Sequence, residues 1–130
     1  MGQPAAKQGD RIQAVDTHLI QPPPPATPVL VPGHVFSGII DGSLSSNVMI
    51  ESRPAATLGS TATNTPPHIP IGGTFVNPPT NRGQIVSGSA TVFINKKPAA
   101  RAGDRALTCN DPVPMPVGTI VATSTVLIGG

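Results

Sequence analysis

Four side chains in this sequence have the chemistry of transition-metal ligands. The chain contains one cysteine, Cys109, and three histidines, His18, His34 and His68. Tetrahedral zinc sites accept imidazole nitrogen and thiolate sulfur. A single cysteine cannot form a disulfide within the chain, so the remaining roles for Cys109 are metal binding or contact with another protein.

The spacing of three of these residues follows an internal repeat. Pro-Ala-Ala occurs at residues 4–6, 54–56 and 98–100. His18 and His68 each stand fourteen residues after the proline of their copy, and Cys109 stands eleven after the third. We expect the loop after each copy to bring one ligand to a common axis. His34 lies outside this register and is expected to complete a closed, structural site with one zinc per chain.

Short strand patterns recur around the three copies. Residues 48–50 and 92–94 place apolar side chains at alternate positions ahead of a three-residue turn and the next proline, and segments 38–43 and 83–89 begin the same unit. Segments 118–121 and 126–130 form a third unit, after which a further Pro-Ala-Ala would be due. We therefore expect one domain over residues 1–130, with three units around an axis and the first and last halves completing one unit, so that the termini lie close together.

The composition predicts a thin core. The 130 residues include 14 glycines and 17 prolines but only three aromatic residues, all phenylalanine. Thin-cored domains commonly need a metal or a partner for stability. We predict an all-β fold, a small cone of short hairpins with long proline-rich loops. The proline runs at residues 21–25, 66–67 and 78–79 are expected to be stiff connectors.

Charge and hydropathy exclude several classes of partner. The net charge of +2 comes from scattered basic residues, and aromatic platforms for bases are absent, which argues against nucleic-acid binding. No apolar stretch approaches the length of a membrane span, so a membrane protein is not expected. The first residues lack the pattern of a signal peptide, and we expect the protein to be made and kept in the cytoplasm until another machine carries it out.

The third copy and its surroundings carry a family resemblance. Pro98-Ala99-Ala100-Arg101 followed by Gly103-Asp104, with the strand at residues 88–95 ahead of it, resembles the PAAR-repeat proteins. The first copy has Gly9-Asp10 but Lys7 at the arginine position. The second copy departs further, with Thr57 and Ser60, so the contacts of that arginine and aspartate are not expected there.

The resemblance implies a role and a set of partners. PAAR-repeat proteins form a pseudo-threefold β cone that caps the trimeric, VgrG-like spike of type VI secretion systems, extracellular contractile injection particles and some phage tails. It implies a structural protein, not an enzyme, with one chain per spike trimer and a metal site just behind the apex. It also implies contact with the target cell envelope, attachment of effector proteins, and delivery outside the cell or into the target cell.

Two other functions were weighed. A zinc-dependent hydrolase would need an open metal position and a general base. Asp16, two residues before His18, is a candidate for that base, although a hydrogen-bonding partner of a ligand or a solvated turn residue suits it better. A zinc-stabilised binding module would recognise a cargo protein or a carbohydrate through the proline-rich loops.

Overall fold

The computed structural model describes residues 2–129 and contains thirteen β-strands and no helix within them. The strands are β1 (Gln3–Pro4), β2 (Arg11–Gln21), β3 (Val29–Gly42), β4 (Met49–Ile50), β5 (Arg53–Pro54), β6 (Thr61–Asn64), β7 (Thr74–Phe75), β8 (Arg82–Ile85), β9 (Phe93–Ile94), β10 (Lys97–Pro98), β11 (Arg105–Thr108), β12 (Met115–Val121) and β13 (Leu127–Ile128). The all-β prediction is confirmed. Within the described residues there is no helix with the length and apolar character needed to cross a membrane.

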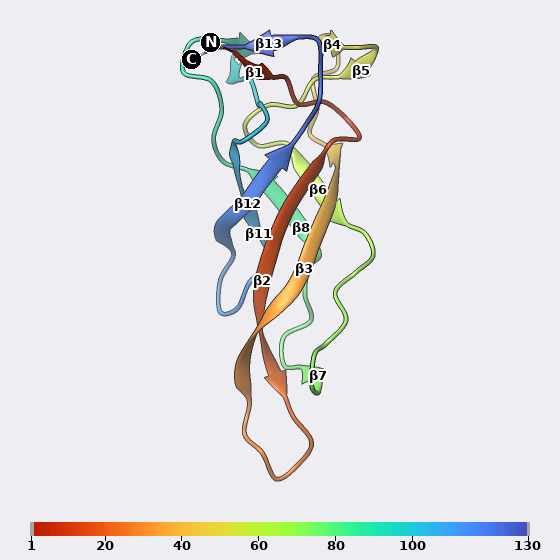
Figure 1. Cartoon of the computed structure of the whole chain (residues 1–130), viewed down its shortest axis with the longest axis vertical. Helices are drawn as coiled ribbons and strands as arrows, with labels where there is room; N and C mark the ends of the chain where they lie inside the picture. Colours follow the sequence, from red (N-terminus) through yellow and green to blue (C-terminus); the bar gives the residue numbers. More distant parts are fainter. Residues whose placement is uncertain (1, 130) are drawn as a thin grey trace.

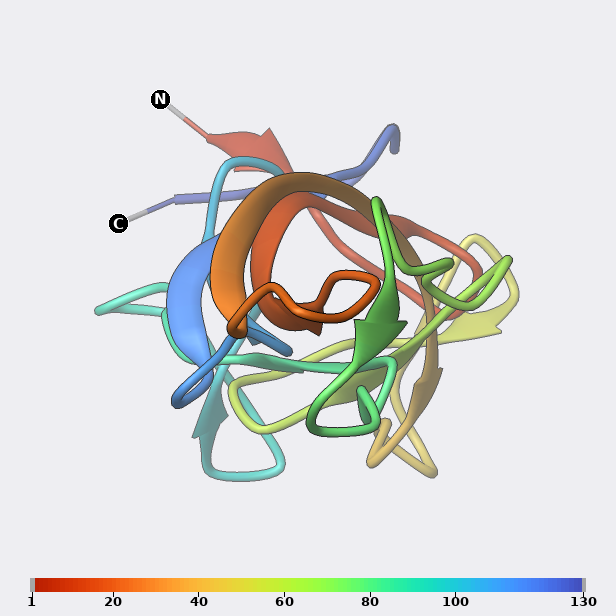
Figure 2. The same cartoon turned by 90° about the horizontal axis from the view of Figure 1, so that it is seen from below.

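The molecule is long and tapers from a wide end to a narrow end (Figure 1). The Pro-Ala-Ala copies belong to three two-stranded ribbons, β1–β13, β4–β5 and β9–β10. The two ribbons labelled in Figure 1, β1–β13 and β4–β5, lie at the wide end. Below them, β12, β11, β8, β6, β3 and β2 pair in that order, and β12 also pairs with β2. That last pairing closes the sheet around the long axis, as the view along the axis shows (Figure 2).

The Pro-Ala-Ala copies form the junction between the ribbons and the closed sheet. The backbone N–H of Ala6 donates to the carbonyl of Ala100, that of Ala56 to Ala6, and that of Ala100 to Ala56, at 3.0, 3.0 and 3.1 Å. These alanines are completely buried. In this ring each copy uses one backbone donor and one backbone acceptor, and a small side chain is expected where three backbones meet.

The turn after each copy repeats as well, but its side chains differ. The carboxylate of Asp10 accepts from the Lys7 backbone N–H at 2.9 Å, and Asp104 accepts from that of Arg101 at 2.8 Å. In the second copy the Ser60 hydroxyl accepts from the N–H of Thr57 at 3.0 Å. The expectation that the charged pair is missing there is confirmed, and a neutral hydroxyl takes its place.

Apolar side chains fill the axis on both sides of the alanine junction. Toward the wide end, isoleucines from the three ribbons pack on the first alanine of each copy, namely Ile50, Ile94 and Ile128 on Ala5, Ala55 and Ala99. Toward the narrow end, the closed sheet encloses a second cluster around Phe36, with Ile12, Ile40, Ile85 and Ile120. The thin core predicted from the composition is thus divided into two small clusters.

The narrow end differs from the predicted hairpins in one respect. β2 and β3 are much longer than the short strands expected, and residues 22–28 form the turn between them. The proline run predicted as a connector between units is therefore the end of a long hairpin, at the lowest point of the view in Figure 1. The pairing of the two strands explains their length, because the ladder runs from Arg11–Ile39 to Ile20–Val29 and continues past Pro32 of β3 with one irregularity.

The alanine junction predicts a strong size limit. Replacing Ala56 with valine adds two methyl groups at a fully buried position on the axis and should destabilise the fold by about 1–3 kcal/mol. Thermal unfolding followed by circular dichroism should show a lower midpoint for Ala56→Val. The same exchange at the exposed Ala90 is the control and should leave the midpoint near that of the unmodified chain. Equal melting of the two variants would contradict a crowded junction.

Candidate metal centre

Three candidate ligands come from the long hairpin. Along β2 the inward positions alternate, which buries Asp16, His18 and Ile20 on one face of the strand. Asp16 lies opposite His34 of β3 in the ladder, and the register shifts between Asp16 and His18. His34 is also buried. The hairpin thus carries a carboxylate and two imidazoles toward the axis, below the apolar cluster around Phe36.

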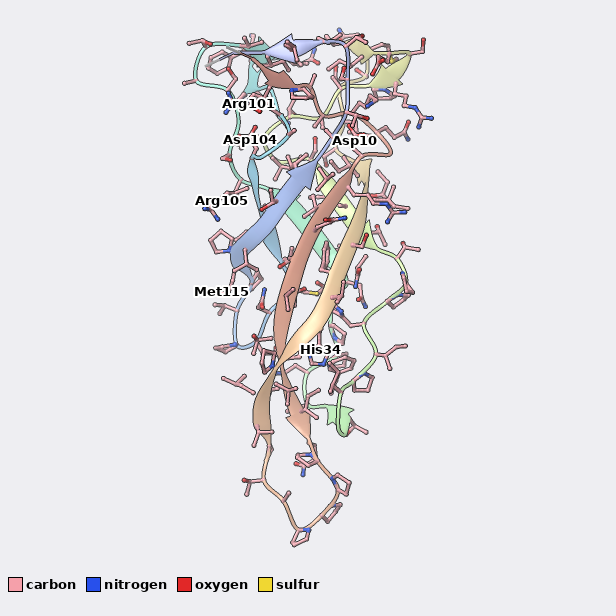
Figure 3. All side chains as sticks on the ribbon, in the orientation of Figure 1. Asp10, His34, Arg101, Asp104, Arg105 and Met115 are labelled. Carbon is pink, nitrogen blue, oxygen red and sulfur yellow. The ribbon has the colours of Figure 1, made fainter. Side chains whose placement is uncertain are left out.

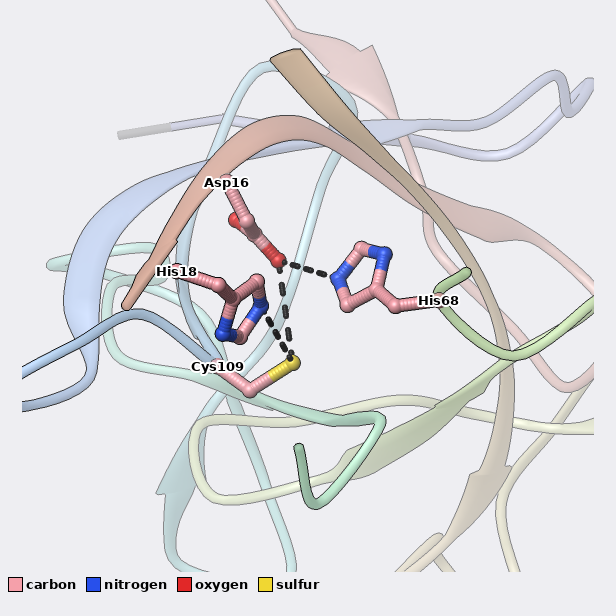
Figure 4. A group of neighbouring side chains, drawn as sticks. All are labelled: Asp16, His18, His68 and Cys109. Atoms are coloured by element: carbon pink, nitrogen blue, oxygen red, sulfur yellow. Dashed lines mark hydrogen bonds and ion pairs between the residues drawn. The ribbon is translucent and has the colours of Figure 1, made fainter. Parts of the chain in front are cut away.

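Two further segments complete a compact group. His68 follows the prolines at 66 and 67, and Cys109 follows β11 directly. One ligand atom from each of Asp16, His18, His68 and Cys109 lies within 4.8 Å of all the others. Figure 4 shows these four side chains converging from three segments. The structure therefore brings together three of the four residues predicted from the sequence and adds Asp16.

The group is closed to solvent. Asp16 is 0% exposed, His18 1%, Cys109 5% and His68 9%. Two aromatic rings border the group. The ring centroid of Phe75 in β7 lies 5.4 Å from that of His18, and the ring centroid of Phe36 lies 6.0 Å from that of His68. Because water has little access, the arrangement suits a structural ion better than a catalytic one, which needs an open position.

Asp16 accepts hydrogen bonds on both carboxylate oxygens. Its Oδ1 accepts from the Thr108 hydroxyl and from the Asn110 amide. Its Oδ2 lies 2.9 Å from His68 Nε2 and 3.7 Å from the Cys109 sulfur. These contacts fix both candidate ligands relative to β2, since a buried carboxylate is stable only when hydrogen-bonded or paired with a cation.

Asp111 holds the ring of His18. Its Oδ2 lies 3.3 Å from His18 Nδ1 and accepts the Leu19 backbone N–H at 2.8 Å. Nε2 of the same ring faces the Cys109 sulfur at 4.0 Å. Burial, followed by the nearby His68, lowers the pKa of His18 below 6.5. The ring is then neutral at pH 7, and a proton on Nδ1 leaves the Nε2 lone pair free for a metal.

Cys109 needs a cation to ionise. Burial is the main cause that raises the pKa of its thiol to about 11, and the carboxylate of Asp16 raises it further. Without a neighbouring cation the thiol is neutral at pH 7, whereas a bound metal would favour the thiolate. Buried imidazoles, a thiol and a carboxylate together fit a divalent metal with nitrogen and sulfur preference.

His34 borders the group without belonging to it. Its ring centroid lies 5.1 Å from that of His18 and 5.9 Å from that of His68. Nδ1 of His34 is the one buried side-chain nitrogen or oxygen that lacks a hydrogen-bond partner among the described residues. An orphaned buried nitrogen is costly, and a ligand bond would satisfy it.

The sequence analysis placed His18 in a loop, whereas it lies in the middle of β2. The alternating pattern of Ile12, Ala14, Asp16, His18 and Ile20 was the available signal, because period-two burial marks a strand. That pattern would also have placed Asp16 on the same face as His18. The supporting Asp111 and Asn110 had no signal of their own, since their roles depend on contacts between distant segments.

Comparison with known proteins gave one match. The family model of the PAAR motif matches residues 21–113 and again residues 76–130, and the two matches together cover well over half of the chain. No curated protein and no solved structure matches it.

Cobalt(II) provides a direct probe of the centre. If Cys109 ligates, the unmodified chain titrated with Co²⁺ should show an absorption for thiolate-to-cobalt charge transfer, which saturates at one metal per chain. Cys109→Ser should abolish that band and lower the apparent affinity, because the only sulfur ligand is lost. Thr108→Val removes a hydroxyl that donates to Asp16 but no ligand, so the band should persist. A native chain that binds Co²⁺ without this band would contradict ligation by sulfur.

Proposed function

Because the chain belongs to the PAAR-motif family, we propose that it is the structural tip of a contractile injection spike. Its wide end caps a trimeric, VgrG-like spike with one chain per trimer, and its narrow end leads into the target cell envelope. The family is structural, and a closed metal group supports the same interpretation for this chain. The proposal treats residues 1–130 as one domain of three repeat units.

The observation that carries the proposal is the threefold repetition of the wide end. Each ribbon presents one large exposed apolar side chain at the same position, just before the buried isoleucine. These are Met49, Phe93 and Leu127, which are 54%, 57% and 61% exposed. Three equivalent apolar contacts on one chain match three identical subunits, which removes the mismatch between a monomer and a trimer.

We further propose that the buried centre binds one structural zinc through His18, His34, His68 and Cys109. The orphaned Nδ1 supports His34 as the fourth ligand. Asp16, whose two oxygens already accept hydrogen bonds, then acts as the acceptor that orients the ligands. Zinc would supply the charge that stabilises the Cys109 thiolate, and it would join β2, β3 and two proline-rich segments where few apolar side chains pack. A hydrolase is not favoured, because Asp16 is fully buried.

The proposed life of the protein has two stages. It is assembled on the spike in the cytoplasm and is then carried out of the cell with the particle, or into the target cell. Effector proteins would attach to surfaces that remain open beside the spike. The spike protein that the wide end binds would identify the contractile machine to which this chain belongs.

Spike binding tests the wide end. Met49→Asp, Phe93→Asp and Leu127→Asp should each weaken binding to the purified trimeric spike by roughly tenfold, and the triple variant should not bind. Leu30→Asp, at the narrow end and 55% exposed, is the matched control and should bind normally. Native mass spectrometry should find one chain per trimer. Unchanged binding of the triple variant, or three chains per trimer, would refute the capping geometry.

Paired variants test the zinc ligands. Elemental analysis of the unmodified protein should find one zinc per chain, and a chelator should lower its melting temperature. His34→Gln should reduce zinc affinity by well over 100-fold, whereas Asp16→Asn should reduce it by about 10–100-fold, as expected for a group that orients a ligand. The reverse order would make Asp16 the fourth ligand in place of His34. Absence of zinc from freshly prepared protein would contradict the proposed zinc site.

A further inference from the structure

The narrow half of the molecule has no exposed charge. It comprises residues 13–37, 65–81 and 107–117, which contain no lysine, arginine or glutamate. Its two acidic residues are turned inward, since Asp16 is fully buried and the Asp111 side chain is 11% exposed and bonded to His18 and Leu19. Figure 3 shows the contrast, with Asp10, Arg101, Asp104 and Arg105 toward the wide end and His34 and Met115 in the narrow half.

The surface of the narrow half is apolar instead. Most of the large hydrophobic side chains that are exposed in the described part of the chain belong to it, and they occur on all of its segments. They are Val15, Val29, Leu30, Val35, Ile69, Ile71, Val76, Val113, Met115 and Val117. Several of them, such as Ile69 at 75% and Val35 at 69%, are far more exposed than a packed core allows. Val35 adjoins Val15 in one surface hollow and Ile69 and Ile71 in another, and exposed apolar side chains that gather in this way mark a binding surface.

The narrow half has few backbone N–H donors in its turns. All but three of the 17 prolines lie in it, and proline has no backbone N–H. In the turn at residues 22–28, only Ala26 and Thr27 retain an N–H. The N–H of Ala26 donates to the Pro23 carbonyl at 3.3 Å, and the Gln21 amide donates to the carbonyls of Pro22 and Ala26.

The free edge of β2 is satisfied by side chains. The N–H groups of Thr17 and Leu19 donate to the side chains of Asn110 and Asp111, both at 2.8 Å. The Asp111 N–H returns a bond to the Thr17 carbonyl, and β7 pairs with the end of β2. A strand edge that would otherwise need water is thus paired within the protein.

From these three features we propose that the narrow half inserts into the hydrocarbon of a lipid bilayer. Entry into hydrocarbon is opposed by exposed charge and by unpaired backbone groups, and it is favoured by apolar area. The narrow half has no exposed charge, its prolines and the side chains along the β2 edge reduce the number of free backbone N–H groups, and its exposed side chains are largely apolar. The inference rests on the proposed function in one respect, since it identifies lipid as the part of the target envelope that this end contacts.

Lipid vesicles test the insertion directly. The full chain should float with vesicles of phosphatidylcholine, which carry no net charge, and high salt should not release it. Val29→Glu should reduce the bound fraction by roughly tenfold or more, because a carboxylate would enter the hydrocarbon. Val126→Glu at the wide end is the matched control, since Val29 and Val126 are 45% and 43% exposed, and it should float like the unmodified chain.

Tryptophan reports which end enters. The chain has no tryptophan, so a single introduced indole gives the only such signal. With vesicles, Val29→Trp should shift to shorter emission wavelength and be quenched by brominated lipid chains, whereas Val126→Trp should show neither effect. Equal quenching of both variants would overturn the inference, because insertion would then not be confined to the narrow half.

Two other outcomes would contradict insertion of the narrow half into a bilayer. Flotation only with anionic vesicles and only at low salt would mean attraction of the basic wide end. Failure to float, together with a dimer in sedimentation that Val29→Glu abolishes, would mean that a second copy covers this surface. The proposed function is judged separately. A chain that binds the spike but not lipid would contradict bilayer insertion alone, whereas a chain that binds lipid but not the spike would contradict the capping role alone.

Discussion

The structure depends on three backbone hydrogen bonds that join Ala6, Ala56 and Ala100 in a ring. Each bond is ordinary in length, but the ring fixes the axis around which all other parts are placed. It buries the three alanines completely, sets the spacing of the three ribbons at the wide end, and leads into the strands of the closed sheet below. A thin core is sufficient here because the backbone itself makes the central contacts.

Below this ring the threefold repetition is lost, and bonds between buried polar side chains replace the repeated backbone bonds. β2 and β3 continue toward the narrow end, joined there only by the short β7, and the segments around His68 and Cys109 are irregular. Buried polar groups connect these parts, with Asp16 at the centre of bonds from Thr108, Asn110, His68 and Cys109. The two ends are thus stabilised by different means, and a metal ion would contribute only at the one that lacks repeated backbone bonds.

The sequence predicted the parts of the fold that repeat. The short apolar runs bounded by turn residues indicated the all-β class, the Pro-Ala-Ala copies indicated the family, and the spacing after these copies predicted that His18, His68 and Cys109 lie in one region. The long hairpin was missed, because a run of prolines at residues 22–25 was interpreted as a connector and the alternation before it was not weighed. Asp16 was considered as a hydrogen-bonding partner of a ligand, but Asp111 could not be assigned, since His18 lies about ninety residues away from it along the chain and only the folded sheet makes them neighbours.

The alanine ring also affects how fast the chain can fold. Its three bonds link segments that are distant in the chain, and the sheet closes only when β12 reaches β2. Loop-closure entropy is lost before such contacts form, and topologies dominated by non-local pairing fold slowly. Two copies alone leave a donor and an acceptor unmatched at the axis, so a partly assembled ring gains little. We expect this polypeptide to fold late and all at once, only after the last repeat has left the ribosome.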